Sequence, residues 1–252
     1  MPQSGKIYFA SDLHLGTPNE ESSAERERKF VRWLSEVQQD AKAIYIIGDV
    51  FDFWHEYKTV VPKGFVRLQG KLAEIADSGI ELHLFTGNHD LWMYGYFEKE
   101  LGAKVYRHPI QINLNGKKFY IGHGDGLGPG DKGYKFIKAV FSNPVCQWLF
   151  RWLHPDIGIG IASYFSYKSR FADAASKTEK EKFLGEDREW LVQFCKSELQ
   201  KTHCDYFVFG HRHLPLDISL PGGSRYINTG DWLTHYSYAV FDGDKLELKY
   251  YS

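Results

Sequence analysis

The chain has 252 residues, of which 43% are hydrophobic, and its formal net charge is −1 at pH 7. This charge excludes a global basic face, so no nucleic-acid partner is expected. The three cysteines are widely spaced and form no Cys-x-x-Cys pair, which argues against a disulfide framework or a thiolate zinc site and favours a reducing compartment. No apolar run approaches the ~18 residues of a membrane span and no signal peptide is visible, so we expect a cytoplasmic protein.

The N-terminal half predicts strands that alternate with helices. Short apolar runs at 7–10, 43–47 and 80–85 are typical of buried strands, whereas 24–38 and 66–76 have apolar residues at helical spacing. This order predicts parallel strands that are connected and covered by helices.

The C-terminal half has the pattern of antiparallel strands. Residues 105–114 and 117–121 predict a hairpin around the Asn115-Gly116 turn. Further strands are predicted at 206–209, 217–220, 225–228, 238–241 and 245–250. Two sheets packed together, with helices outside them, accommodate both halves in a single domain over residues 1–252.

The segment between the two halves is rich in aromatic and basic residues, and its only acidic residue from 132 to 170 is Asp156. Apolar residues recur there at helical spacing, and Pro144 suits the first turn of a new helix capped by Asn143 or Ser142. We predict a helical insertion over residues 127–190 within the domain. Its basic residues from 132 to 170 are Lys132, Lys135, Lys138, Arg151, Lys168 and Arg170.

Five predicted strands end in side chains that can bind a metal ion. These side chains are Asp12 and His14; Asp49; Asn88, His89 and Asp90; His123 and Asp125; and His211 and His213. Ligands of open α/β sheets bind just beyond the carboxyl ends of the strands, so we expect all five clusters at one rim. Taken singly, an aspartate after a strand is more often a helix cap, and a buried histidine is more often hydrogen-bonded core. The combination of five such ends favours a metal site.

The motif order D-x-H, G-D-x-x-D, G-N-H-D, G-H-G-D and G-H-x-H resembles that of the calcineurin-like binuclear metallophosphoesterase family. The resemblance implies an α/β fold, a four-layer αββα sandwich of two mixed sheets, with two divalent metal ions at its rim. Mn²⁺ is the first expectation, with Fe and Zn as alternatives. One ion would be held by Asp12, His14, Asp49 and His213. The other would be held by Asp49, Asn88, His123 and His211, with Asp49 bridging the two.

Other residues of these motifs are expected to support the metal ligands or to act in catalysis. Asp52, Asp90, Asp125 and Asp231 are candidates to fix the second nitrogen of the histidine ligands, although Asp52 could instead cap a helix or hold the loop. His89 follows Asn88 in the catalytic block that the resemblance implies. It is expected to act as a general acid or to stabilise phosphoryl oxygens; the alternative is a loop histidine bonded to a carboxylate.

A closer resemblance is to the UDP-2,3-diacylglucosamine pyrophosphohydrolases of lipid A synthesis, a group of enzymes within that family. It rests on the stretches "SDLHLG", "IIGDVFDFW", "HGDGLGPGDKGYKFIKAVFSNPVCQWLFRWL", "IGIASYFSYKSR" and "INTGDW". It implies hydrolysis of a lipid-linked UDP-sugar at the α-phosphorus, giving UMP and 2,3-diacylglucosamine 1-phosphate. The insertion would then be a lid over the acyl chains, and Asp131, Lys168, Ser169 and Arg170 would contact substrate.

This resemblance also implies transient contact with the inner-membrane surface, and no obligate protein partner is evident. One position departs from it: the best-known enzymes of the group carry arginine after the Gly-Asn pair, where this chain has His89. Two alternatives therefore stay open. One is a paralogue that acts on another nucleotide diphosphate, a phosphodiester or a phosphomonoester, and the other is a non-catalytic scaffold for protein partners.

Overall fold

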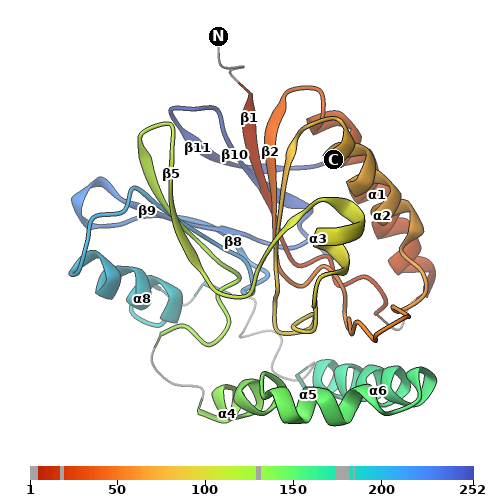
Figure 1. The fold of residues 1–252 in the computed structure, drawn as a ribbon. Coiled ribbons are helices and arrows are strands. Elements are labelled where there is room, and N and C mark those ends of the chain that lie inside the picture. The colour runs from red at the N-terminus through yellow and green to blue at the C-terminus, as the bar shows by residue number, and fades with distance from the viewer. Residues whose placement is uncertain (1–4, 18–19, 129–131, 174–181, 184) are drawn as a thin grey trace.

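The computed structural model describes residues 5–17, 20–128, 132–173, 182–183 and 185–252. Two mixed β-sheets lie face to face at its centre (Figure 1). The first sheet has the strand order β11-β10-β1-β2-β3-β4, and β1 to β4 run parallel. Its strands are β1 (Lys6–Ala10), β2 (Ala41–Ile47), β3 (Glu81–Phe85), β4 (Lys104–Tyr106), β10 (Ser237–Phe241) and β11 (Leu246–Tyr250).

The second sheet has the strand order β5-β6-β7-β9-β8. Strand β7 is parallel to both β6 and β9, whereas β5 and β8 are antiparallel edge strands. Its strands are β5 (Ile110–Leu114), β6 (Lys117–Ile121), β7 (Tyr206–Phe209), β8 (Pro215–Ser219) and β9 (Arg225–Thr229), with a short 3₁₀ turn at Pro221–Gly223.

Helices cover the outer face of each sheet, which completes four layers. Helices α1 (Glu20–Val37), α2 (Val66–Asp77) and α3 (Tyr96–Leu101) pack on the first sheet. Helix α8 (Trp190–Leu199) packs on the second. The predicted αββα sandwich is confirmed.

The inner strands β1 and β2 of the first sheet are apolar at nearly every position because both of their faces are buried. In β1, Ile7 and Phe9 face the core between the two sheets, while Tyr8 and Ala10 face the helices. Across that core Phe9 stacks on Phe119 of β6, with ring centroids 6.0 Å apart. The two sheets therefore pack against each other close to the strand ends that carry the polar motifs.

The prediction of a single strand over residues 105–114 is wrong, because this segment forms two strands in different sheets. Strand β4 continues the first sheet beside β3, and β5 begins the second sheet beside β6. Pro109 lies between them and cannot donate a ladder hydrogen bond, which favours the break. The predicted turn at Asn115-Gly116 is present, with φ of 49° and 84°.

The purely antiparallel pattern predicted for the C-terminal half is also wrong. Strand β7 lies parallel to its two neighbours, and β10 and β11 belong to the first sheet. Two parallel strands must be joined by a long crossover, and the helices between β6 and β7 form it here. The apolar pattern of the strands alone does not show in which direction β7 runs beside β6. This parallel arrangement puts the carboxyl end of β7 beside that of β6.

Helices α4 (Lys132–Phe141), α5 (Pro144–Arg151) and α6 (Pro155–Asp173), which we call the lid helices, lie together outside the sandwich (Figure 1). The Asn143 side chain caps α5 by accepting a hydrogen bond from the Val145 amide at 2.8 Å. Trp92 of the sandwich donates a hydrogen bond to the Phe141 carbonyl at 2.8 Å and packs against Phe150. These contacts attach the lid helices to the sandwich.

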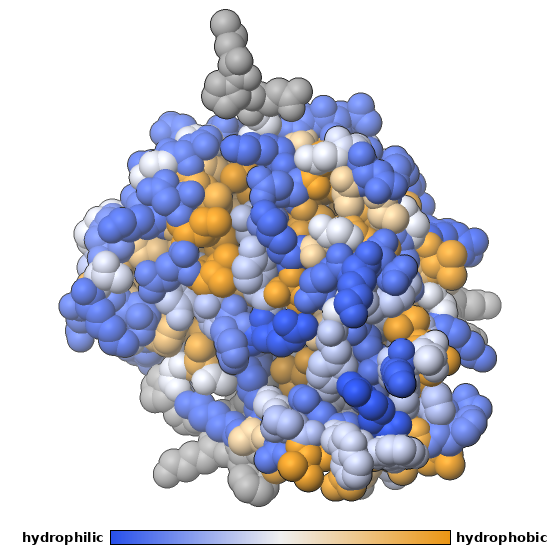
Figure 2. All heavy atoms as spheres, in the orientation of Figure 1, coloured by the Kyte–Doolittle hydropathy of each residue, from blue (hydrophilic) through white to orange (hydrophobic). Residues whose placement is uncertain are grey.

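Much of the apolar surface of the lid helices faces outward. Trp148 is 56% exposed and Trp152 is 75% exposed. Figure 2 shows apolar residues, in orange, at the surface in the region of these helices. Among the described residues, no helix combines the length and the apolar character that crossing a membrane requires.

Candidate metal centre

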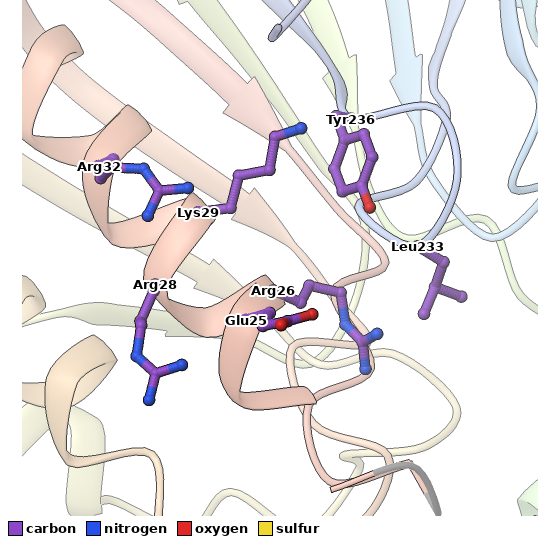
Figure 3. Close-up of a pocket in the computed structure, with 7 residues that line it drawn as sticks. All are labelled: Glu25, Arg26, Arg28, Lys29, Arg32, Leu233 and Tyr236. Atoms are coloured by element: carbon purple, nitrogen blue, oxygen red, sulfur yellow. The ribbon is translucent and has the colours of Figure 1, made fainter. Parts of the chain in front are cut away.

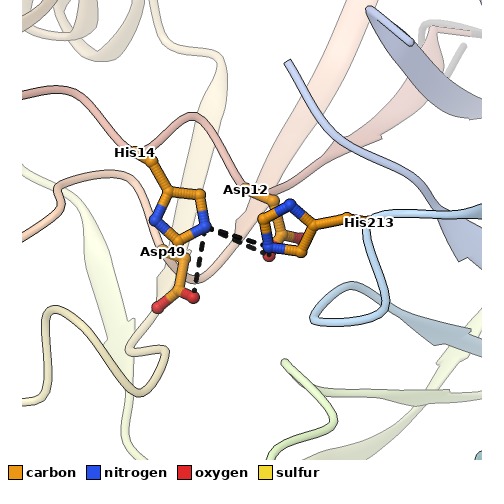
Figure 4. Close-up of side chains that lie close together, drawn as sticks. All are labelled: Asp12, His14, Asp49 and His213. Carbon is orange, nitrogen blue, oxygen red and sulfur yellow. Dashed lines mark hydrogen bonds and ion pairs between the residues drawn. The ribbon is translucent and has the colours of Figure 1, made fainter. Parts of the chain in front are cut away.

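The polar side chains that follow β1, β2 and β7 converge on one point. His14 Nε2 lies 3.5 Å from Asp49 Oδ2 and 3.1 Å from His213 Nε2 (Figure 4). His213 Nε2 lies 3.3 Å from Asp12 Oδ1. Each of these four residues offers one ligand atom, and these atoms all lie within 4.8 Å of one another. This is the first group of ligands that the sequence predicts.

A second group shares Asp49 with the first. Asp49 Oδ2 lies 3.3 Å from His123 Nε2, and that nitrogen is 3.2 Å from Asn88 Oδ1. Ligand atoms of Asp49, His123 and His211 lie within 4.8 Å of one another. The Asp49 carboxylate therefore lies between the two groups, which is the position expected of a bridging ligand.

The backbone at these positions is unusual. Five of the residues have positive φ: Asp12 (57°), His14 (45°), Asp49 (51°), His211 (68°) and His213 (53°). Non-glycine residues rarely adopt this conformation, and each such residue costs about 1–3 kcal/mol where it is strained. Such outliers cluster at functional sites, where the surrounding structure holds them.

The glycines within the motifs let these segments approach closely. A Cβ atom on Gly48 would lie 2.6 Å from His123 Nδ1, and one on Gly87 would lie 2.5 Å from the Asp49 amide nitrogen and against its carboxylate. These close approaches explain why glycine precedes the polar residue at these strand ends.

The centre holds buried carboxylates that stay ionised. Burial acts to raise the pKa of the Asp12 carboxyl, but the nearby His213 and His14 side chains outweigh it and lower that pKa to about 2. Burial opposes ionisation of Asp49 too, and His123, His89 and His14 nevertheless bring its pKa well below the usual value. Asp12 Oδ1 is fully buried and accepts no hydrogen bond within the described part of the chain.

A divalent cation fits this environment. Buried negative charge is costly unless it is paired or coordinates a metal. The donors are carboxylate oxygens, imidazole nitrogens and one amide oxygen, a mixed set that suits divalent manganese, iron or zinc. The imidazole of His211 is suited to coordination because burial and the neighbouring His123 lower its pKa to about 4, which keeps it neutral.

The histidines are held by hydrogen-bond partners behind them. His123 Nδ1 donates to the Ile47 carbonyl at 2.8 Å, which turns Nε2 toward Asp49. His213 Nδ1 lies 3.5 Å from Asp231 Oδ2. The other oxygen of Asp231 accepts hydrogen bonds from the Thr234 and His235 amides, both at 2.9 Å. Such partners fix the tautomer and the orientation of a metal-binding imidazole.

Asp90 supports the loops of the site. Its carboxylate accepts hydrogen bonds from the Gly87 amide at 2.7 Å and the Val50 amide at 2.8 Å. It thereby ties the segment of Asn88 to the segment of Asp49. Burial and the charge of Asp49 raise the pKa of Asp90 to about 7. Asp90 therefore holds backbone amides of the two segments that carry Asp49 and Asn88, and its support of a histidine stays a prediction.

Asp125 and Asp52 connect the centre to the lid helices. Asp125 Oδ2 accepts a hydrogen bond from Lys138 of α4 at 2.5 Å. Asp52 Oδ2 accepts one from Ser166 of α6 at 2.8 Å, while its Oδ1 lies 3.5 Å from His14 Nδ1. Asp52 therefore lies behind a predicted ligand, as expected for a supporting acid.

His89 is placed at the edge of the centre. Its backbone amide donates to Asp49 Oδ1 at 2.9 Å, and its Nδ1 donates to the Asp52 carbonyl at 3.1 Å. The His89 ring packs edge-on against His14, with ring centroids 4.8 Å apart. Its side chain is 21% exposed, so a substrate can reach the ring.

A match to a protein family agrees with the metal site that the geometry indicates. Residues 5–215 match the model of the calcineurin-like phosphoesterase family. The chain belongs to this family. Calcineurin-like phosphoesterases bind divalent metals and hydrolyse phosphoesters, so the chain is a hydrolytic enzyme with a divalent-metal centre.

Relatives with assigned names cover nearly the whole of this phosphoesterase. It is 41% identical over 253 residues to the UDP-2,3-diacylglucosamine hydrolase of Porphyromonas gingivalis, covering 97% of both chains. It is 30% identical over 231 residues to the protein of that name from Stenotrophomonas maltophilia, covering 89% of this chain and 90% of that one. Among solved structures, the phosphoesterase Yfce from E. coli matches with a TM-score of 0.47 at 17% identity, covering 97% and 92% of the two chains.

The predicted substrate contacts of this phosphoesterase are not placed by the structure. Asp131 lies outside the described residues, as do the side chains of Lys168, Ser169 and Arg170, whose backbone belongs to α6. Ser166 on the same helix was not predicted, although it contacts Asp52 and lies 3.4 Å from His89 Nδ1. The sequence carried no signal for Ser166, because its partners are distant in the chain.

One cavity of the phosphoesterase lies beside α1, away from the predicted metal ligands. It has a volume of about 320 Å³ and is lined by Glu25, Arg26, Arg28, Lys29, Arg32, Leu233 and Tyr236 (Figure 3). Lys29 Nζ lies 3.6 Å from the centre of the Tyr236 ring. None of the predicted metal ligands lines this cavity, so it is not the reaction centre.

Replacing Asp49 by alanine tests the shared position of this carboxylate. We expect metal-dependent hydrolysis of bis-p-nitrophenyl phosphate to fall to the level seen without added metal, because both groups of ligands lose a member. Asp244→Ala, at an exposed aspartate of a turn, is the matched control and should keep wild-type activity. Full activity in Asp49→Ala would refute the bridging role.

Proposed function

We propose that this phosphoesterase hydrolyses UDP-2,3-diacylglucosamine at the phosphorus next to the uridine, giving UMP and 2,3-diacylglucosamine 1-phosphate. The observation that carries the substrate assignment is the 41% identity, over 97% of both chains, to an enzyme named for this substrate. The reaction type is supported by the family and by the Asp49-centred arrangement of ligands. His89 stands where the best-known enzymes of the group carry arginine, and this difference contradicts neither the sequence identity nor the arrangement of the ligands.

Two Mn²⁺ ions are the proposed cofactors. Asp12, His14, Asp49 and His213 would hold one ion. Asp49, Asn88, His123 and His211 would hold the other. Such a pair supplies polarisation of the phosphoryl oxygens and a water of lowered pKa.

His89 is the proposed catalytic side chain, next to Asn88. Its Nδ1 is occupied by the Asp52 carbonyl, so Nε2 is the nitrogen available to a substrate. From there it can donate a proton or a hydrogen bond to an oxygen on the reacting phosphorus. Water attacks that phosphorus, and the bond to the bridging oxygen breaks, so the phosphate on the sugar side leaves with the diacylglucosamine.

The lid helices are the proposed binding region for the acyl chains, within a lid over residues 127–190. Their exposed apolar side chains include Trp148, Trp152 and Phe165, and acyl chains require such a surface. Asp131, Lys168, Ser169 and Arg170 are proposed contacts to the sugar or phosphate. The same surface would allow transient contact with the membrane that holds the substrate.

The direct test is an assay of purified, Mn²⁺-loaded protein with UDP-2,3-diacylglucosamine, in which released UMP is measured. We expect UMP and 2,3-diacylglucosamine 1-phosphate in equal amounts, and no UMP after the metal is removed by chelation. Absence of UMP together with rapid hydrolysis of simple phosphodiesters would select a paralogue with another substrate.

Replacing His89 by alanine should lower kcat by about 10²–10⁴-fold, the usual contribution of a positioned acid or base. Metal content, measured by elemental analysis, should stay at the wild-type value because the imidazole is not a proposed ligand. His203→Ala is the matched control, since His203 is exposed and pairs with Asp205 at 3.5 Å on another part of the chain. Unchanged kcat in His89→Ala would make this histidine structural.

A further inference from the structure

A small cavity opens directly beside His123. It has a volume of about 260 Å³ and lies between the segment after β4, the segment after β6, and α4. The side chains that matter for its chemistry are Tyr106, Arg107, His108, His123, Lys135 and Lys138. Because His123 is a proposed metal ligand, a molecule in this cavity can reach the reacting phosphorus.

The cavity and helix α6 approach Asp49 through different histidines. His123, which lines the cavity, approaches Asp49 Oδ2 at 3.3 Å. Helix α6 instead reaches the side of His14 and His89, through the bond from Ser166 to Asp52. A substrate whose phosphorus lies over Asp49 can therefore extend one end toward α6 and the other into the cavity.

The cavity has a lining suited to a polar, anionic group. Lys138 is bonded to Asp125, and Lys135 Nζ donates to the Gly128 carbonyl at 2.8 Å. Arg107 donates to the Met93 carbonyl at 2.6 Å. Lys138 and Arg107 are paired with acids, Asp125 and Glu98, whereas Lys135 bonds a neutral carbonyl. Lys135 is therefore the positioned cation of this lining that favours phosphate oxygens.

Tyr106 adds an aromatic side chain to the lining, and the buried Phe85 packs behind it. Tyr106 stacks on Phe85 with ring centroids 4.8 Å apart, and its hydroxyl is hydrogen-bonded to His83 at 3.0 Å. Both rings line the cavity. This rigid pair differs from the exposed apolar side chains of α5 and α6, which suit acyl chains.

The size of the cavity excludes the whole substrate. Pockets for drug-sized ligands are usually about 300–1,000 Å³, so 260 Å³ accommodates only part of a molecule with two acyl chains. We propose that this cavity binds the nucleoside end of the substrate, uridine with its phosphate, and that Lys135 and His108 recognise it. This inference rests on the proposed function. It adds the orientation of the bound substrate, with the nucleotide toward α4 and the acyl chains toward α5 and α6.

The test measures inhibition by UMP and by inorganic phosphate, with the full-length Mn²⁺-loaded protein hydrolysing bis-p-nitrophenyl phosphate. Phosphate can bind at the metal centre without filling the cavity, whereas UMP must occupy both. In Lys135→Ala we expect the inhibition constant of UMP to rise about tenfold, the usual effect of losing a charged hydrogen bond, and that of phosphate to rise clearly less. His108→Ala, from a different segment, should raise the UMP constant in the same selective way.

Lys249→Ala is the matched control, because Lys249 lies on edge strand β11 and pairs with Glu247 at 3.2 Å. It should change neither constant. UMP constants that stay at the wild-type value in both cavity variants would overturn the proposal. So would an equal rise for phosphate, or a selective rise for 2,3-diacylglucosamine 1-phosphate.

The two experiments distinguish an error in the proposed function from an error in this inference. If wild-type protein releases no UMP from UDP-2,3-diacylglucosamine, the lipid substrate is wrong. A selective loss of UMP inhibition in the two cavity variants would still support a nucleotide subsite. If UMP is released but the variants bind UMP as the wild type does, the subsite is wrong and the function stands.

Discussion

The buried charge of Asp49 is the constraint on which this site depends. Its carboxylate is 1% exposed, and Oδ2 lies 3.5 Å from His14 Nε2 and 3.3 Å from His123 Nε2. An imidazole that binds a metal is neutral, so with the histidines in that form metal cations balance this buried anion. The glycines that allow close approach and the left-handed residues at the strand ends are consequences of bringing five segments around this carboxylate.

The lid helices are tied to the same centre at two places. Lys138 of α4 reaches Asp125, and Ser166 of α6 reaches Asp52. The first contact is to the segment of His123 and the second is to the acid beside His14 and His89, so the lid helices border chemically different regions. The cavity beside α4 is small, with cationic and aromatic lining, whereas most of the exposed apolar side chains lie on α5 and α6, with Val140 and Phe141 of α4 next to them. A substrate with a polar end and a lipid end matches this division.

The sequence predicts the metal centre better than it predicts the fold around it. Each proposed ligand lies within a few residues of a buried strand, so a local motif such as D-x-H or G-H-x-H is sufficient to predict it. The split between β4 and β5 and the parallel pairing of β7 depend on long-range packing, which local patterns do not encode. Ser166 was missed for the same reason, since it is 114 positions from Asp52.

The central claim is that one carboxylate holds two metal ions, and anomalous diffraction from crystals grown with Mn²⁺ tests it most directly. We expect two anomalous peaks about 3.5–4 Å apart, the usual spacing in two-metal sites, with the Asp49 carboxylate in contact with both. A single peak, or two peaks of which only one touches Asp49, would contradict the account.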